Sequence, residues 1–456
     1  MDGKLKKNFI YVILAQLISL LVSCSTNLIL PKFISTTDFS YWQLFMFYTL
    51  YIPCLALGLN DGVYLRYGGK DKDELDYTAI KSQYVFGIIY QIILAMLVGQ
   101  FLIYFSDSNG RRWVIYSVLV YYIIYTCHNF LSYIFQATGE SNVWSKSIIL
   151  HRIIFLSAQT VLLLTGIYNV FYFIPAFNIA LLVSLAYLYF FIQKYFKKVK
   201  IDWRLGATEA LLSIKVGISL MVANVCSTLI LGVGRFIIDN KWGLLAFGKV
   251  SFSLTLINFA LTFISQVGIV LFPALRRIDG KKLQRYYKKI AVGLFFLLPL
   301  MYIIYLPLKF VLLLWLPNYS QSIDYLSILL PICFFDSKMN LMGNTFLKVL
   351  SKQVVLLKIN ILTIIFGGIW GIVAAYVFDD MKLVVVGMVI SVIFRSIIAD
   401  IVLGKELSVS LWRLEILDIV LAIIFIITAT YLLWWQAFFS MIFVYVIRSV
   451  YLKFIG

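Results

Sequence analysis

The stretch VFYFIPAFNIALLVSLAYLYFFIQ (170–193) carries no charged residue and is long enough to cross a bilayer as one α-helix. The basic segment KYFKKVKIDWR (194–204) follows it directly. Apolar runs of this kind recur along the whole chain, in which 62% of the residues are apolar, 13% are charged and the mean hydropathy is +0.94. Soluble domains contain about 25% charged residues. The composition therefore predicts an all-α membrane protein and excludes a soluble enzyme.

We expect about fourteen transmembrane helices. With the N-terminus in the cytoplasm, the cytoplasmic segments hold roughly 27 Lys and Arg residues and the outer segments about 5. This bias predicts a multi-pass protein of the cytoplasmic (inner) membrane with both termini in the cytoplasm. The predicted spans cover residues 8–30, 41–59, 82–105, 113–136, 144–166, 169–192, 208–238, 243–274, 290–316, 323–346, 354–377 and 383–404, and two further helices share 412–452.

The first predicted span contains Cys24 in a setting that resembles a lipoprotein signal. The apolar run continues to Pro31, which is long enough to span the bilayer. We therefore expect an uncleaved first helix and an unmodified Cys24.

The chain divides best at the basic segment 194–204. We predict an N-terminal lobe over 1–198 with helices 1–6, a C-terminal lobe over 199–408 with helices 7–12, and helices 13 and 14 over 409–456. A weak internal sequence similarity supports two related lobes, because CSTNLILPKFI (24–34) resembles CSTLILGVGRFI (226–237). Two related lobes around a midplane cavity form a recurrent transporter architecture.

Several observations disfavour catalysis and metal binding. No predicted loop exceeds about twenty residues, which leaves no room for a catalytic or nucleotide-binding domain. The five cysteines show no CxxC or Cys/His spacing, and His128 and His151 both lie inside predicted helices. We therefore expect no enzyme activity, no cofactor and no metal site. The net charge of +18 is attributed to loops that face anionic lipid headgroups, rather than to nucleic-acid binding.

Charged residues inside the predicted spans are the main functional candidates, because each costs on the order of 2.5–3.5 kcal/mol at the bilayer centre. Acids are fewer: Asp336 lies near the middle of helix 10, and Asp61, Glu209, Asp239 and Asp400 lie at helix ends. This count predicts an interior with excess positive charge and an anionic substrate headgroup. The interior cations are Arg152, Lys215, Arg235, Lys249, Lys309, Lys338 and Arg395.

Each candidate has a structural alternative. Arg235, Lys249 and Lys309 could reach lipid headgroups by snorkelling. Lys338 could pair with Asp336, although residues two apart on a helix point in different directions, and Arg395 could bond backbone carbonyls. His151 could relay protons, but histidines that only pack between helices are more common.

Three stretches carry a family resemblance. LPKFISTTDFSYWQLFMFYTLYIPCLALGLNDGVYLRYGG (30–69) joins helix 1 to helix 2 and an inner loop, GRFIIDNKWGLLAFGKVSFSL (234–254) places Arg235 near the end of helix 7, and LFPALRR (271–277) closes helix 8. Together with the helix count, they resemble the Wzx-type polysaccharide flippases of the multidrug/oligosaccharidyl-lipid/polysaccharide (MOP) exporter superfamily. The sequence departs from this pattern at Gly234, where an acid often precedes the arginine.

The resemblance implies a fold like that of MATE transporters and lipid II flippases. Such flippases move undecaprenyl-pyrophosphate-linked oligosaccharides from the inner to the outer leaflet by alternating access, for surface polysaccharides such as lipopolysaccharide O-antigen. It also implies membrane lipids, H⁺ or Na⁺ as a coupling ion, and the polysaccharide polymerase machinery as partners. Helices 1, 2, 7 and 8 largely line the cavity in this superfamily. The headgroup candidates are therefore Arg66, Lys215, Arg235 and Lys249, with Lys338 and Arg395 from the interior, and the ion-coupling or partner candidates are Asp61, Asp336 and His151.

Other functions compete with this interpretation. A drug exporter of the same superfamily usually moves cations and would need acids in its cavity. A lipid II flippase handles the same kind of headgroup, so the sequence does not separate it from a polysaccharide flippase. An oligosaccharide polymerase would carry a large outer loop with arginines, whereas the outer loops predicted here are short.

Overall fold

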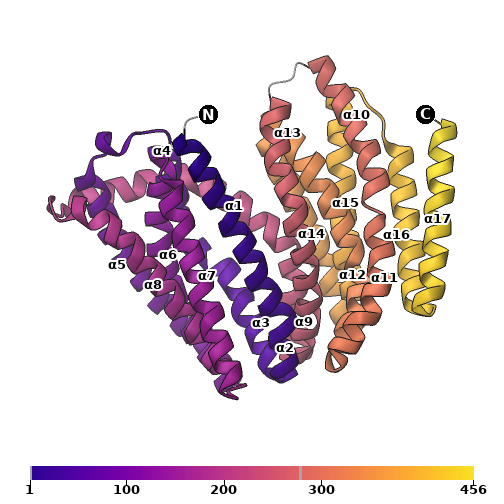
Figure 1. The fold of residues 1–456 in the computed structure, drawn as a ribbon, viewed down its shortest axis with the longest axis horizontal. Helices are drawn as coiled ribbons and strands as arrows, with labels where there is room; N and C mark the ends of the chain where they lie inside the picture. The colour runs from indigo at the N-terminus through magenta and orange to yellow at the C-terminus, as the bar shows by residue number, and fades with distance from the viewer. Residues whose placement is uncertain (1–2, 277–279, 456) are drawn as a thin grey trace. The chain divides into compact units, whose positions relative to one another are not determined.

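The computed structural model describes residues 3–276 and 280–455, and every regular element in these ranges is a helix (Figure 1). Eleven helices within them are long and apolar enough to cross a membrane, and a bent pair adds a twelfth. Two predicted spans, 208–238 and 243–274, correspond to the two parts of a long helical segment that is kinked at Gly243. The last apolar stretch, Trp434–Val450, is shorter than the eleven. The prediction of an all-α, multi-pass membrane protein is confirmed.

The chain forms two compact units, residues 1–225 and 226–456. Unit 1 contains α1 (Gly3–Cys24), η1 (Ser25–Ile29), α2 (Leu30–Phe33), α3 (Thr36–Tyr51), η2 (Ile52–Ala56), α4 (Leu59–Tyr67), η3 (Lys72–Glu74), α5 (Tyr77–Tyr104), α6 (Asn109–Ala137), α7 (Ser141–Leu164), α8 (Val170–Phe196) and the first part of α9 (Trp203–Arg276).

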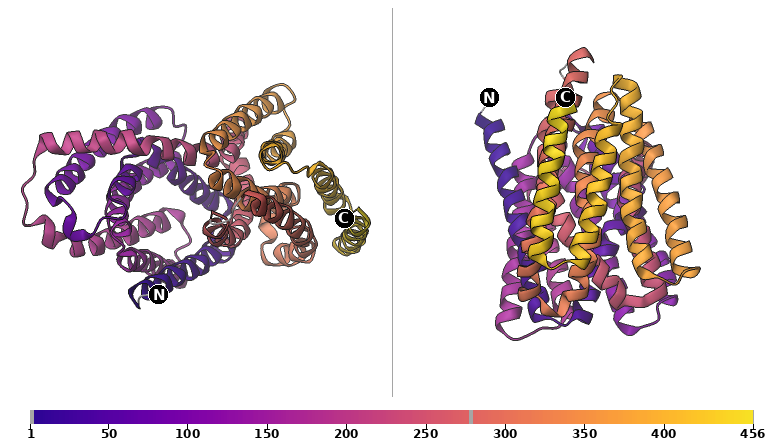
Figure 2. Two further views of the ribbon diagram at one scale, coloured as in Figure 1. Left: turned by 90° about the horizontal axis from the view of Figure 1, so that it is seen from above. Right: turned by 90° about the vertical axis from the view of Figure 1, so that its right-hand side faces the viewer.

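Unit 2 contains the rest of α9, α10 (Gly280–Leu297), α11 (Leu300–Trp315), η4 (Pro317–Tyr319), α12 (Ser320–Lys338), η5 (Met339–Asn344), α13 (Thr345–Val349), α14 (Gln353–Tyr376), α15 (Met381–Leu407), α16 (Trp412–Tyr431) and α17 (Trp434–Ile455). Its helices α10–α17, orange to yellow in Figure 2, run roughly parallel or antiparallel to one another.

The units divide inside α9, whereas the predicted boundary lies at 198/199, and α16 and α17 belong to unit 2. The first part of α9 stays with unit 1 because local contacts hold it there. The backbone N–H of Asp202, just before α9, donates to Ser82 Oγ at 2.9 Å, and Glu209 forms an ion pair with Arg66. The predicted assignment of lobes itself stays a prediction.

A break in the second predicted span positions α4, the helix that carries Asp61 and Arg66. Leu57 and Gly58 adopt left-handed backbone conformations, with φ of 50° and 78°, and α4 is bent by 64° from the helical segment before it. Gly58 accommodates this conformation without the steric cost that a side chain would add.

Helix α4 then packs backbone to backbone on α9, along a contact that we call the α4–α9 seam. The seam consists of three pairs of residues: Gly58 with Gly217, Gly62 with Ser213, and Arg66 with Glu209. Along each helix these residues are four apart, and the two helices run in opposite directions. Residues four apart share one helix face, and small residues let two backbones approach closely. The seam therefore presents Arg66 to Glu209.

In unit 2, the span Pro317–Val349, which contains α12, is the most buried of the candidate spans, at 83%. Protein therefore surrounds Asp336 and Lys338 near the C-terminal end of α12, whereas Asp324 near its start is exposed. Charged side chains inside a membrane-spanning unit need such surroundings, because partners or polar groups must offset their desolvation.

The orientation in the membrane stays a prediction, with a direct test. Reporter fusions after Lys200 and after Lys289 should give cytoplasmic signals, and a fusion at Asp239–Lys241, just before the break at Gly243 in α9, should report the outside. An external signal from the fusion after Lys289 would contradict both the predicted span count and the cytoplasmic C-terminus.

Candidate functional site

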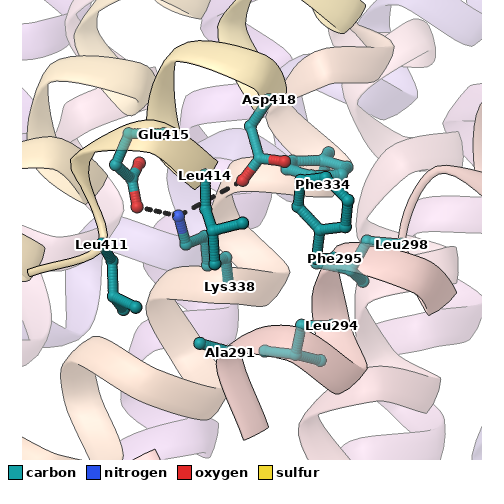
Figure 3. Close-up of a pocket in the computed structure, with 10 residues that line it drawn as sticks. All are labelled: Ala291, Leu294, Phe295, Leu298, Phe334, Lys338, Leu411, Leu414, Glu415 and Asp418. Atoms are coloured by element: carbon teal, nitrogen blue, oxygen red, sulfur yellow. Dashed lines mark hydrogen bonds and ion pairs between the residues drawn. The ribbon is translucent and has the colours of Figure 1, made fainter. Parts of the chain in front are cut away.

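Unit 2 contains five buried charged side chains in mutual contact, which we call the ionic cluster: Lys338, Asp400, Glu415, Asp418 and Arg448. The Lys338 ammonium lies 3.2 Å from Asp400 Oδ2 and 3.4 Å from Asp418 Oδ2, and it also pairs with Glu415. Figure 3 shows the Lys338 amino group between the carboxyl groups of Glu415 and Asp418. Arg448 pairs with the other oxygen of Asp418.

Four helices supply the cluster, which explains how the sequence forms it. Lys338 ends α12, Asp400 lies on α15, and Arg448 lies on α17. Glu415 and Asp418 are three residues apart near the start of α16, so they share one face of that helix. Each carboxylate therefore joins α16 or α15 to the cation of another helix.

Neighbouring side chains complete the cluster. The Tyr287 hydroxyl of α10 donates to Asp400 Oδ1 at 3.0 Å, and the Arg448 guanidinium lies 3.4 Å from the centre of the Phe295 ring. All five charged residues are at most 8% exposed. Truncating one member of such a buried group is strongly destabilising, because its partners keep their charges without compensation.

Two hollow spaces adjoin the cluster. A void with room for about one water molecule, roughly 10 Å³, lies among Leu294, Phe295, Lys338 and Asp418 (Figure 3). An open cavity of about 600 Å³ lies between α15 and α16. Asp400 and Glu415 line this larger cavity together with apolar residues that include Ile397, Ile401, Trp412, Ile416 and Ile419. These two carboxyl groups are thus the members of the cluster that an open space reaches.

A second buried network surrounds Arg395. Its Nη1 lies 3.1 Å from Asp336 Oδ1, its Nε donates to Asn360 Oδ1 at 2.9 Å, and its Nη2 donates to Ser227 Oγ at 3.3 Å. The predicted alternatives for two residues are therefore wrong. Lys338 does not pair with Asp336, since their side chains leave the helix in different directions, and Arg395 bonds side chains rather than backbone carbonyls.

In unit 1, Arg66 is neutralised at the α4–α9 seam. Its Nη2 lies 2.5 Å from Glu209 Oε2, and its Nη1 donates to Ser213 Oγ at 2.8 Å. Asp61, a predicted partner candidate for the headgroup cations, does not pair with Arg66, because the two residues are five apart on α4 and only Arg66 faces the seam. Asp61 forms no ion pair with any residue in the described ranges.

The remaining predicted residues differ in their surroundings. Lys215 of α9 is exposed, and Arg235 is buried at 7% exposure. Lys249 donates to the amide oxygen of Gln321 at 2.5 Å. Within the parts of the chain that the structure describes, Lys215 and Lys249 have no carboxylate partner.

Three further interior residues have defined environments. Lys309 lies 3.4 Å from Asp324 Oδ1 and donates to the Ala429 carbonyl at 3.1 Å. His151 is buried, with its ring 4.8 Å from that of Phe177. His128 lies 3.0 Å from Ser184 Oγ. Neither histidine contacts a carboxylate among the described residues, so a proton relay through them stays a prediction.

The structure does not gather the six predicted cations of the sequence analysis into one site within either unit. Arg66 and Lys215 lie in unit 1, and in unit 2 Lys338 and Arg395 belong to separate networks. The prediction that positive charge exceeds negative charge in the interior is wrong for the ionic cluster, which contains three carboxylates and two cations. The sequence count omits Glu415 and Asp418 and assigns Arg448 to a cytoplasmic segment. Their signal was present as acids three residues apart in the apolar stretch LEILDIV (414–420).

No family model and no curated protein sequence matches this chain. Solved structures share its fold. An inward-facing MATE multidrug-resistance transporter of the MOP superfamily aligns with a TM-score of 0.65 at 14% identity, covering 86% of this chain and 94% of the transporter. The lipid II flippase MurJ in an inward closed conformation gives 0.65 at 13% identity, over 98% and 99% of the two chains.

A MOP-superfamily transporter from Pyrococcus furiosus, described as having a binding pocket of reversed polarity, gives a TM-score of 0.51 at 15% identity over 90% of this chain and 96% of that one. At these identities the likeness establishes the fold alone. The predicted fold class, similar to MATE transporters and the lipid II flippase, is confirmed.

Proposed function

We propose that this chain is a flippase that moves undecaprenyl-pyrophosphate-linked oligosaccharide units from the inner to the outer leaflet of the cytoplasmic membrane by alternating access. The proposal places it in surface-polysaccharide biosynthesis, including O-antigen. Its fold is shared with a lipid II flippase and with MATE exporters, which supports a transporter over a polymerase. A chain of this kind catalyses no covalent reaction.

The observation that carries the proposal is the set of span cations with no carboxylate partner within the described residues. Lys215 is exposed on α9, Lys249 donates only to an amide oxygen, and Arg152 of α7 forms no ion pair. A cation in a span is costly unless an anion or water compensates it. Phosphate oxygens accept strong, charge-assisted hydrogen bonds from Lys and Arg, so a pyrophosphate headgroup is the ligand that fits these residues.

The presence or absence of a carboxylate partner also reduces the set of candidate headgroup-binding residues. Arg66, Lys338 and Arg395 already contact protein carboxylates, so we assign them to structure or coupling. By this criterion Lys215 and Lys249 remain as headgroup candidates, and Arg235 stays a candidate because of the family resemblance. An exporter of cationic drugs would need unpaired acids in these positions, which disfavours that alternative.

Complementation tests the function and separates the two lipid substrates. Expression should restore surface polysaccharide in a strain that lacks its polysaccharide flippase, and should not restore growth in a strain depleted of its lipid II flippase. Restoration of growth in the second strain alone would assign lipid II as the substrate. Failure in both strains, with the protein present in the membrane, would count against the proposal.

Arg235 gives a specific prediction. Its guanidinium lies on α9 at 7% exposure and can hold two phosphate oxygens with one planar group. A hydrogen bond to a charged group contributes about 1.5–3 kcal/mol, so Arg235→Ala should lower polysaccharide restoration roughly tenfold to a hundredfold. Arg235→Lys should retain part of the activity, because the charge remains.

The matched control is Lys241→Ala, six residues further along α9, whose side chain pairs with the exposed Asp379 at 3.3 Å. It should leave restoration unchanged at equal protein levels. Full restoration by Arg235→Ala would remove Arg235 from the proposed site and favour snorkelling to lipid headgroups.

A further inference from the structure

Two carboxyl groups of the ionic cluster, those of Asp400 and Glu415, contact the same ammonium group. Lys338 Nζ lies 3.2 Å from Asp400 Oδ2 and pairs with Glu415 Oε1, so the two carboxyl groups lie next to each other. Glu415 Oε2 is fully buried and accepts no hydrogen bond from any group in the described residues. Two ionised carboxylates in this position would repel each other, and Glu415 Oε2 would also lack a donor.

The charge count gives the same result. The cluster holds three carboxylates and two cations, so it carries one uncompensated negative charge if every carboxyl is ionised. A single proton would neutralise this charge and supply the missing donor. A metal cation is not needed, because the Lys338 ammonium already occupies the space between the carboxylates.

From these contacts we infer that Asp400 and Glu415 share one proton, and that this pair is a proton-binding site of unit 2. The inference names H⁺ as the coupling ion of the proposed flippase. Its coupling role rests on the proposed function, whereas the proton site itself does not. A proton from water in the open cavity binds Glu415 Oε2, and the resulting O–H donates to Asp400 Oδ2. When the pair releases the proton, the proton returns to water.

The groups packed around the pair determine which carboxyl groups hold the proton. Asp418 of α16 receives both cations, Lys338 from α12 and Arg448 from α17, and therefore stays ionised. The Tyr287 hydroxyl from α10 donates to Asp400 Oδ1, and the only donor group that Asp400 Oδ2 contacts among the described residues is the Lys338 ammonium. The proton therefore belongs to the remaining pair of oxygens.

The cavity between α15 and α16 gives the site its access. Asp400 and Glu415 both line it, and the polar residues Lys405, Ser408 and Ser410 line it as well. Lys338, Glu415 and Asp418 border the small void. Proton binding changes the net charge of the cluster by one, and so changes the electrostatic attraction between α15, α16 and the cation-bearing helices.

Infrared difference spectroscopy of the full chain in lipid nanodiscs tests the site without any substrate. The wild type should show a protonated carboxylic acid band at neutral pH that shifts in D₂O. Glu415→Gln and Asp400→Asn should each remove that band. The control Glu406→Gln, on the same helix as Asp400 but in an exposed pair with Lys352, should keep it. Absence of the band in the wild type, or its persistence in both cluster variants, would overturn the inference.

Transport in proteoliposomes tests the coupling role separately, with a fluorescent undecaprenyl-pyrophosphate disaccharide as the probe. Flipping by the wild type should respond to an imposed pH gradient, and flipping by Glu415→Gln should not. Wild-type flipping that ignores the gradient would refute H⁺ coupling while leaving the flippase proposal intact. Absence of flipping at any gradient would refute the flippase proposal, and the infrared band would still report the proton site.

Discussion

Replacing Lys338 with methionine should prevent the accumulation of folded protein. The Lys338 ammonium contacts Asp400, Glu415 and Asp418, and its residue is only 5% exposed. Methionine keeps the length and apolar character of the side chain, so the change removes the charge with little loss of packing. Removing one partner of a buried ion pair costs about 3–5 kcal/mol, and here one cation serves three carboxylates. Size-exclusion profiles and thermal unfolding in detergent measure the effect.

Two variants show whether the loss comes from charge. Lys352→Met removes a cation from an ion pair with Glu406 that is 35% and 37% exposed, and should cost about 0–1 kcal/mol. The double variant Lys338→Met with Glu415→Gln removes one negative charge as well, and should recover part of the folded protein. A Lys338→Met variant as stable as the wild type would contradict the buried cluster.

The helices of this fold could be predicted because their signal is local. Twenty apolar residues in sequence specify a span whatever the rest of the chain does, and residues 170–193 lie within α8 in the structure. The two parts of α9 show that this signal also locates a break. The predicted spans 208–238 and 243–274 are separated at 239–242, and the structure has a non-helical backbone at Gly243, with a φ of 80°.

The partners of the interior charges could not be predicted, because they are separated by long stretches of chain. Asp336 and Lys338 are neighbours in sequence, yet one pairs with Arg395 and the other with Asp400, Glu415 and Asp418. Helix geometry predicts only that residues two apart diverge. Which helix each side chain meets depends on the packing of α12, α15 and α16, and no local pattern specifies that packing.

Arg448 counts as a cytoplasmic cation in the predicted topology, whereas the structure buries its side chain in the ionic cluster. A cation near the end of the last helix is typical of a cytoplasmic flank, and the sequence alone offers no nearby acid. In the structure its partner, Asp418, lies on the preceding helix, and the short turn between α16 and α17 brings the two together. The acids three residues apart on α16 were the available signal, because an apolar span rarely carries two carboxylates without partners.

Gly62→Val should abolish folding of the chain through the α4–α9 seam. A Cβ atom at Gly62 would overlap the backbone carbonyl of Ser213, and a Cβ atom at Gly58 would lie 2.5 Å from the carbonyl carbon of Gly217. Backbone atoms cannot rotate away as a side chain can, so a substituent must separate the two helices. Separation would also break the Arg66–Glu209 ion pair one turn further along the seam.

The size of the added group gives a graded series for this test. Gly62→Ala should cost at least about 3 kcal/mol, the upper range for overpacking, and the branched valine should leave no folded protein in size-exclusion profiles. The control is Gly293→Ala on α10, where an added Cβ meets no atom within 4 Å. That change should raise stability by up to about 1 kcal/mol, because alanine is the better helix former. Equal stability of Gly62→Val and the wild type would show that α4 and α9 do not pack closely at this position.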